Sequence, residues 1–226
     1  MSIRAIPALV TLAALATGCA SAPAGSYFPP PSDPATARVA QSLHSAAFAA
    51  GDDPSRYSFA FVSTREAAVY SDEERTFYIT DGLLRLPPPV VDAIIAHEVA
   101  HEVMGHAGTR RTLSLTLSAG FGAAGMVAPG AGLVDLIVNP LAVRAFTRRQ
   151  ELVADQKAVE ILRAMGYPAP RRTLADALRS VDGVTPKPKE ELTGLLSAHA
   201  DLKDRLAALE PLEPVGSPVT SARHTD

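Results

Sequence analysis

Ile94-Ile95-Ala96-His97-Glu98-Val99-Ala100-His101 is the stretch of this chain that decides the fold. It places the pattern H-E-x-x-H inside an apolar run with helical spacing. On a helix, two histidines four residues apart project from the same face, so both rings can bind one zinc ion at about 2.0–2.1 Å. The glutamate between them can face a water on the metal. The stretch therefore predicts a metal site and a hydrolytic reaction on one turn of helix.

The helix that carries this motif is expected to be buried. Pro87-Pro88-Pro89 allow a clean start near Val90, and Gly108 is a stop signal after Ala107. Apolar residues fall on more than one face of this segment, which indicates a helix packed on several sides. A metal site needs such rigid support.

Length and charge bound the possible functions. The chain has 226 residues, of which 47% are hydrophobic and 20% charged, enough for one full hydrophobic core. The formal net charge is −3, and basic residues cluster only in short pairs such as Arg110-Arg111 and Arg148-Arg149. This pattern argues against a nucleic-acid partner.

The N-terminus has the pattern of a secretory signal. Arg4 precedes an apolar stretch from Ile6 to Ala16, and small residues then lead to Cys19, the single cysteine. The segment resembles bacterial lipoprotein signals, in which Cys19 would be acylated and become the mature N-terminus. By the same resemblance, Ala20 after the cysteine favours the outer membrane, with the protein facing the periplasm. The alternative is an ordinary cleaved signal with an incidental cysteine.

The remaining periodicities predict an α+β fold that is predominantly helical, with a small β-sheet beside the motif helix. Residues 20–34 are rich in Ala, Ser and Pro and predict an extended tether. A last helix is expected to open at Asp201 and Asp204 and to end at Pro211. The other helices are expected at 34–51, 90–107, 149–165 and 171–181, and the strands at 57–63, 67–70 and 76–80.

Residues 113–143 form a long segment with a single charge, Asp135, and many glycines and alanines. The length could span a bilayer, but Pro129, five glycines and Asn139-Pro140 interrupt it. The composition predicts helical hairpin segments packed over the catalytic core. The alternative is a segment that dips into the membrane.

A catalytic zinc needs a third protein ligand beyond His97 and His101. His106 lies about 140° around the helix from His101, so it cannot reach the same ion. Met104 and Ala107 stand where a metzincin would have glycine and histidine, which excludes that class.

Glu151 is the best third ligand, about fifty residues downstream. Asp155 follows one helical turn later on the same face, where it can accept a hydrogen bond from a ligand histidine or an arginine. Taken alone, the pair could also be a solvated acidic patch on a helix surface. The upstream motif favours the metal site.

Three blocks in this order resemble metallopeptidase family forty-eight, the HtpX-like and CAAX-prenyl-protease-like zinc endopeptidases. The first is the motif at 94–101 followed by His106. The second is Phe146-Thr147-Arg148-Arg149-Gln150-Glu151 through Ala154-Asp155, and the third is Ser197-Ala198-His199 through Arg205-Leu206. The match departs from the family at Ala200, where proline is usual, and at Glu66-Ala67-Ala68, in the region that resembles the substrate-pairing edge strand.

The resemblance implies a gluzincin-type zincin core and one Zn²⁺ per chain, held by His97, His101 and Glu151. It implies that Glu98 is the general base and that His199 assists the oxyanion. Arg205 would order the site by pairing with Asp155.

The sequence thus predicts a signal peptide at 1–18, a flexible tether at 19–33, a zinc metallopeptidase domain at 34–211 and a disordered tail at 212–226. The expected function is a zinc-dependent endopeptidase, anchored to the outer membrane through lipid on Cys19, that hydrolyses misfolded or envelope proteins. Its expected partners are protein or peptide substrates, the membrane and the outer-membrane assembly machinery. The alternative is a chaperone or assembly factor for outer-membrane proteins with a gated or silent site. A structural lipoprotein with an accidental H-E-x-x-H is a third reading.

Overall fold

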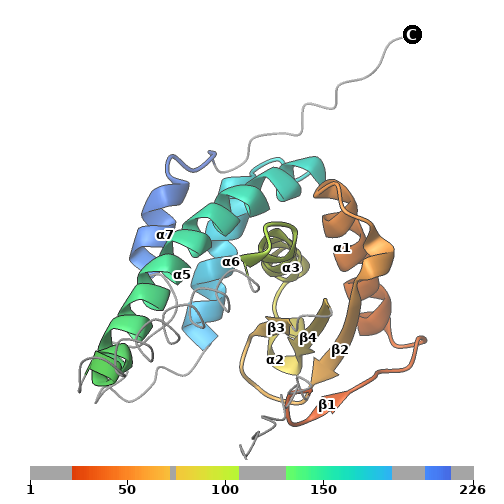
Figure 1. Ribbon diagram of the computed structural model, residues 1–226. Helices are drawn as coiled ribbons and strands as arrows, with labels where there is room; N and C mark the ends of the chain where they lie inside the picture. Colours follow the sequence, from red (N-terminus) through yellow and green to blue (C-terminus); the bar gives the residue numbers. More distant parts are fainter. Residues whose placement is uncertain (1–21, 72–74, 107–130, 185–201, 215–226) are drawn as a thin grey trace, which may run out of the picture.

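The computed structural model describes residues 22–71, 75–106, 131–184 and 202–214, with only the helical backbone over 131–147. Helices dominate, and one small mixed sheet lies to one side of them (Figure 1). The architecture is α+β and mostly helical, as predicted. Cys19, His199 and residues 113–130 lie outside the described residues.

The motif helix α3 (Pro88–Val103) is the centre of the fold. It packs against α1 (Pro34–Ala49), α5 (Ala131–Ala164) and α6 (Pro170–Val184) (Figure 1). Ten of its 16 residues are buried, because apolar side chains occur on several faces. The prediction of a buried helix is confirmed.

The sheet has the strand order β1-β2-β4-β3, with a parallel central pair and antiparallel edges. Alternate residues of the central strands point to opposite faces. Phe61, Phe77 and Ile79 enter the main core, while Ala60, Val62 and Tyr78 form a separate buried cluster on the other face. The strands are β1 (Ser26–Tyr27), β2 (Ser58–Val62), β3 (Val69–Ser71) and β4 (Thr76–Thr80).

Strand β1 lies inside the segment expected to be a flexible tether. It pairs with β2, and the Tyr27 hydroxyl donates a hydrogen bond to Asp81 Oδ1 at 2.6 Å. The Tyr27 ring also meets Phe61 edge-on, with centroids 5.8 Å apart. The expectation that residues 19–33 have no packed structure is therefore wrong for Ser26 and Tyr27, because a two-residue strand is too short to leave a periodic signal.

Two short helical elements were not predicted: the 3₁₀ turn η1 (Pro54–Arg56) and the helix α2 (Asp81–Leu84). Helix α2 follows β4 directly, and Thr80 caps it by accepting a hydrogen bond from the Leu83 backbone N–H at 3.2 Å. A Cβ at Gly82 would lie 2.2 Å from the backbone oxygen of Glu66. Glycine is thus required where α2 crosses the loop before β3.

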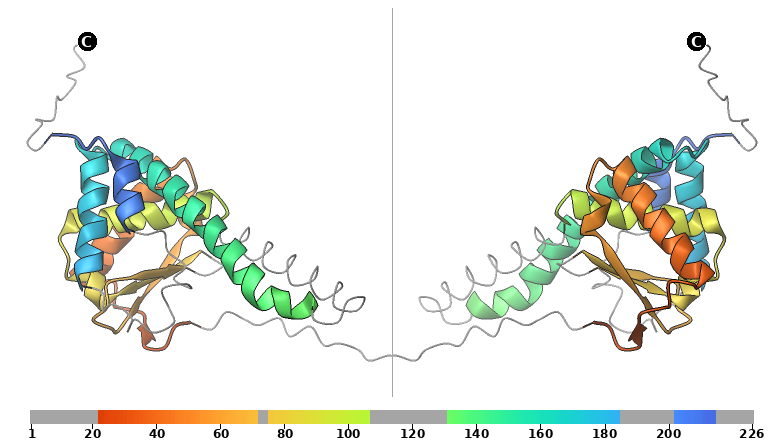
Figure 2. Two further views of the ribbon diagram at one scale, coloured as in Figure 1. Left: turned by 90° about the vertical axis from the view of Figure 1, so that its left-hand side faces the viewer. Right: turned by 90° about the vertical axis from the view of Figure 1, so that its right-hand side faces the viewer.

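Helix α5 corrects two sequence predictions. It begins at Ala131 rather than Arg149, so Glu151 lies in its middle and not near its start. Residues 131–143, expected within a helical hairpin, belong to this single helix, which continues through Pro140. A proline removes one backbone hydrogen bond and bends a helix, but it does not always end one. Figure 2 shows the length of α5 beside the shorter helices. Among the described residues, no helix is long and apolar enough to cross a bilayer.

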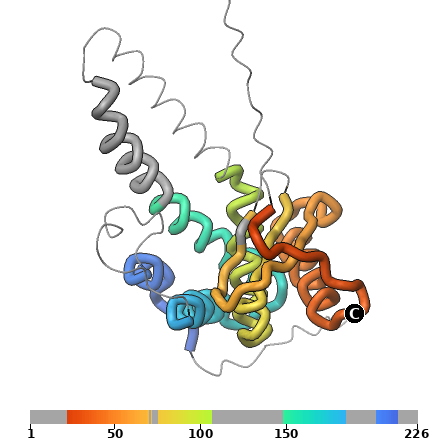
Figure 3. The backbone as a smooth tube through the Cα atoms, turned by 90° about the horizontal axis from the view of Figure 1, so that it is seen from below, coloured from red at the N-terminus to blue at the C-terminus, as the bar shows by residue number. Residues whose placement is uncertain are grey.

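Helices α6 and α7 (Leu202–Leu209) lie side by side, on the opposite side of α3 from α1 (Figure 3). Glu213 accepts hydrogen bonds from the backbone N–H groups of Arg171 (3.1 Å) and Arg172 (2.9 Å), at the start of α6. The predicted start of the tail at residue 212 is therefore too early, because residues 212–214 are part of the fold.

Candidate metal centre

Three side chains from two helices meet between α3 and α5. His97 and His101 come from α3, Glu151 comes from α5, and all three are buried. The two His Nε2 atoms lie 3.1 Å apart, and each lies 3.3–3.4 Å from a Glu151 carboxylate oxygen. Four ligands on a tetrahedral zinc with bonds of 2.0–2.1 Å would be about 3.3 Å apart. These spacings are close to those of ligands around one zinc-sized ion, so the three side chains could hold a metal.

The other ring nitrogen of His97 is held by Asp155, whose Oδ1 lies 3.0 Å from His97 Nδ1. Asp155 stands one helical turn after Glu151 on α5, as the sequence spacing predicted. A carboxylate that accepts the Nδ1–H fixes the ring orientation and leaves Nε2 free to bind a metal.

Arg205, on α7, also lies in the site. Its Nε and Nη2 donate to the two Asp155 oxygens at 2.8 Å and 2.6 Å, and its Nη1 lies 3.3 Å from Glu151 Oε2. The expected pairing of Arg205 with Asp155 is thus present, in bidentate form. The guanidinium is buried and balances the two buried carboxylates.

The electrostatics keep both carboxylates ionised. Burial raises the pKa of Glu151, but hydrogen bonds with His101 and His97 lower it by more, and the net pKa lies below its ordinary value. Burial likewise opposes the effect of Arg205 and His97 on Asp155, and the net pKa is again lowered. Burial and Arg205 lower the pKa of His97, yet its carboxylate partners raise it to about 9. Metal binding must therefore displace a proton from His97.

His106 has a place that the sequence did not predict. Helix α3 ends at Val103, and Gly105 adopts the left-handed conformation with φ of 64°. His106 follows directly, and its Nδ1 lies 3.0 Å from His101 Nδ1. Gln150 holds the loop by donating to the His106 backbone oxygen at 3.3 Å. His106 thus contacts His101, a candidate metal ligand, and Gly105, not Gly108, was the signal for the turn.

The arrangement agrees with a comparison of the sequence with known families. The family model described as Peptidase family M48 matches residues 32–213, most of the chain. This chain belongs to peptidase family M48. It is similar to the "Protease HtpX homolog" of Chlorobium phaeobacteroides (strain BS1), with 28% identity over 183 residues, covering 64% of this chain and 58% of that protein. The chain thus spans less than two thirds of the length of this relative.

Membership of family M48 makes the chain a member of a metallopeptidase family, whose metal the His97, His101 and Glu151 cluster could hold. Within this M48 domain, Glu98 follows His97 and is partly exposed, whereas His97 and His101 are buried. A general base that exchanges protons with water needs such access. His199, the other residue expected to be catalytic, lies outside the described residues.

Proposed function

We propose that this chain is a zinc-dependent endopeptidase with a gluzincin-type zincin core, which hydrolyses peptide bonds in misfolded or envelope proteins. The observation that carries the proposal is the convergence of His97, His101 and Glu151, with the two His Nε2 atoms 3.1 Å apart and each 3.3–3.4 Å from a different Glu151 oxygen. Two neutral nitrogens and one carboxylate form a donor set that suits zinc, and a catalytic zinc site keeps three protein ligands.

The residues around the proposed zinc ion have separate roles in the reaction. When bound, zinc lowers the pKa of a water to about 7 and polarises the scissile carbonyl. Glu98 accepts the proton of the attacking water and then donates a proton to the leaving amine. Asp155 orients His97, and Arg205 holds Asp155 and Glu151 in place through the contacts described above.

His199 is proposed to approach the oxyanion of the reaction and to assist it. The support for this role is the resemblance of the Ser197-Ala198-His199 segment to the family pattern, and it precedes α7, which carries Arg205.

The experiment that tests the reaction is Glu98→Gln. The variant keeps the shape of the side chain but cannot take up a proton, so we expect one zinc per chain and loss of unfolded-casein cleavage by at least about 100-fold. Glu160→Gln, an exposed glutamate on α5, is the matched control and should cleave normally. Full activity of Glu98→Gln would refute the mechanism, and purified protein without stoichiometric zinc would refute the site.

We also propose that the mature protein is an outer-membrane lipoprotein that faces the periplasm, acylated on Cys19. The support is the N-terminal pattern of one cation, an apolar stretch and a cysteine. Mass spectrometry of the protein from membranes should find lipid on Cys19, and Cys19→Ala should release it from the membrane fraction. An unmodified Cys19 in mature protein would contradict this.

The alternative function, a chaperone or assembly factor that works with the outer-membrane assembly machinery, is separated by the same Glu98→Gln variant. If that variant fully replaces the wild-type protein in a deletion strain, binding and not hydrolysis is the biological role. A failure to complement, with normal zinc content, supports the peptidase.

A further inference from the structure

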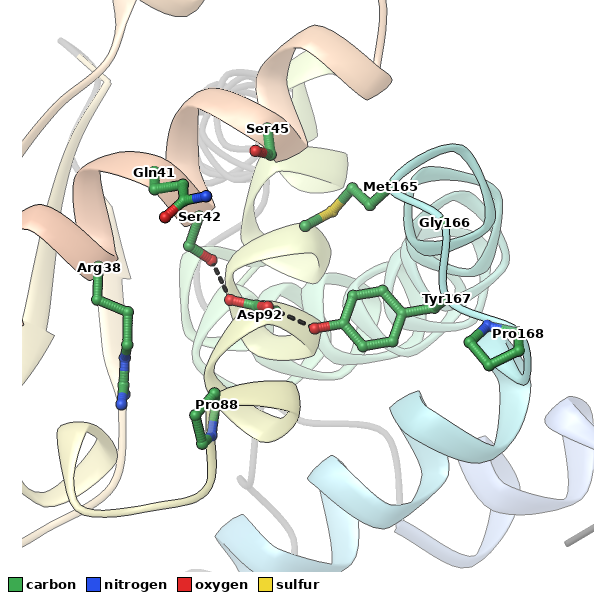
Figure 4. A pocket seen from close by; sticks show the side chains of 10 residues that line it. All are labelled: Arg38, Gln41, Ser42, Ser45, Pro88, Asp92, Met165, Gly166, Tyr167 and Pro168. Carbon is green, nitrogen blue, oxygen red and sulfur yellow. Dashed lines mark hydrogen bonds between the residues drawn. The ribbon is translucent and has the colours of Figure 1, made fainter. Parts of the chain in front are cut away.

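A cavity of about 510 Å³ lies between α1, the start of α3 and the turn that joins α5 to α6 (Figure 4). Asp92 of α3 forms part of its wall. On a helix, Asp92 lies about 140° from His97 and about 180° from His101, so the cavity opens on the side of α3 away from the metal centre. The proposed peptidase reaction does not use it.

One wall of the cavity is a fixed hydrogen-bonded cluster. Ser42 Oγ donates to Asp92 Oδ1 at 2.5 Å, and the Tyr167 hydroxyl donates to Asp92 Oδ2 (Figure 4). Each carboxylate oxygen thus accepts one hydrogen bond, and each keeps a lone pair for another donor. The cluster joins α1, α3 and the α5–α6 turn, so this wall is rigid.

The opposite charge in the cavity wall is Arg38, the only cation among the ten lining residues. Its Nε and Nη2 are buried from water and have no hydrogen-bond partner in the described part of the chain. Leaving buried donors without a partner destabilises a protein, and more so when the group is charged. These two N–H groups form one edge of the guanidinium and point in parallel, the arrangement that matches the two oxygens of a carboxylate.

We propose that this cavity binds a small monocarboxylate, held side-on by Nε and Nη2 of Arg38. In this arrangement the protein covers Nε and Nη2, so binding requires the partly exposed side chain of Arg38 to turn this edge into the cavity. Arg38 and Asp92 are the only charged lining residues, and their charges cancel. Such a site favours a single negative charge over a phosphate dianion, and the free lone pairs of Asp92 favour a carboxylate that also carries a hydroxyl group.

The test is isothermal titration of the full-length protein with lactate, propionate, propionamide and inorganic phosphate. We expect saturable binding of lactate, weaker binding of propionate and none of the neutral propionamide. Arg38→Gln should weaken lactate binding by at least about tenfold. Arg38→Lys, which keeps the charge but lacks the parallel edge, should also weaken it. Arg163→Gln, an exposed arginine of α5 outside the cavity, is the matched control and should bind lactate normally.

Circular dichroism of each variant establishes that it is folded, and Arg38→Lys serves if Arg38→Gln does not fold. Equal lactate affinity in wild type and both Arg38 variants would overturn the site. So would the absence of saturable binding of either carboxylate up to about 50 mM. Tighter binding of phosphate than of lactate would overturn the ligand class.

Discussion

Replacing Arg205 with methionine should destabilise the metal-free protein strongly. The change removes two hydrogen bonds to Asp155, at 2.8 Å and 2.6 Å, and a contact with Glu151 at 3.3 Å. Asp155 is only 1% exposed, so water cannot replace the lost donors. Breaking a buried ion pair by removing one partner costs about 3–5 kcal/mol. For a domain of this size, 1 kcal/mol corresponds to about 2–4 °C, so the Tm should fall by roughly 6–20 °C.

Urea unfolding of the zinc-free protein, followed by circular dichroism, measures this loss. The matched control is Arg179→Met, because Arg179 forms an exposed ion pair with Asp176 that should contribute about 0–1 kcal/mol. The double variant Arg205→Met, Asp155→Asn should recover part of the loss, since one uncompensated charge is gone. Zinc should also reduce the loss of stability in Arg205→Met, because the ion balances the charge of Glu151. A loss no larger than that of the control would refute the argument that Arg205 neutralises buried carboxylates.

Three further changes test other parts of the structure. Gly82→Ala should cost about 3 kcal/mol in urea unfolding because its Cβ would meet a backbone oxygen at 2.2 Å, whereas Gly183→Ala in α6, with nothing within 4 Å of the new methyl, should be neutral or stabilising. His106→Ala should weaken zinc binding by about 10–100-fold in a chelator competition, while the exposed His44→Ala should leave it unchanged. In zinc-free protein, His97 is protonated in the fold up to pH about 9, against a reference value of 6.5, so its contribution to stability is complete below pH 6.5 and is lost as the pH rises through 9. Saturating zinc should remove that decline, because it binds the neutral ring, and a zinc-free stability that rises between pH 6.5 and 9 would contradict the assigned contacts.

The shared faces of the two residue pairs were predictable because helix geometry relates sequence spacing directly to direction. His97 and His101 had to share a face of any helix, and Glu151 and Asp155 likewise. The place of His106 was not predictable from the same rule. The rule assumed that the helix continues to Ala107, but it ends at Val103 and Gly105 adopts the left-handed conformation.

The fold class could be predicted from the periodicity of apolar residues. The ends of several helices and strands could not, because they depend on contacts between segments. Pro140 lies within α5, although prolines usually end helices in sequence-based prediction. The short strand at Ser26–Tyr27 exists because it pairs with β2, and α2 exists because Gly82 permits a close backbone approach. For β1 and α2, a neighbouring segment determined the local structure.

Because β1 is paired with the sheet, the distance between Cys19 and the folded domain is limited. Only six residues, 20–25, separate Cys19 from the first residue of β1. A fully extended chain covers at most about 3.5 Å per residue step, and seven steps join Cys19 to Ser26, so this link spans no more than about 25 Å. With Cys19 acylated as proposed, the domain cannot leave the immediate surface of the bilayer. Its substrates would then be polypeptides that are themselves at that surface, such as membrane proteins stalled during insertion, and a protein diffusing in the wider compartment would have to come to the membrane to be cleaved.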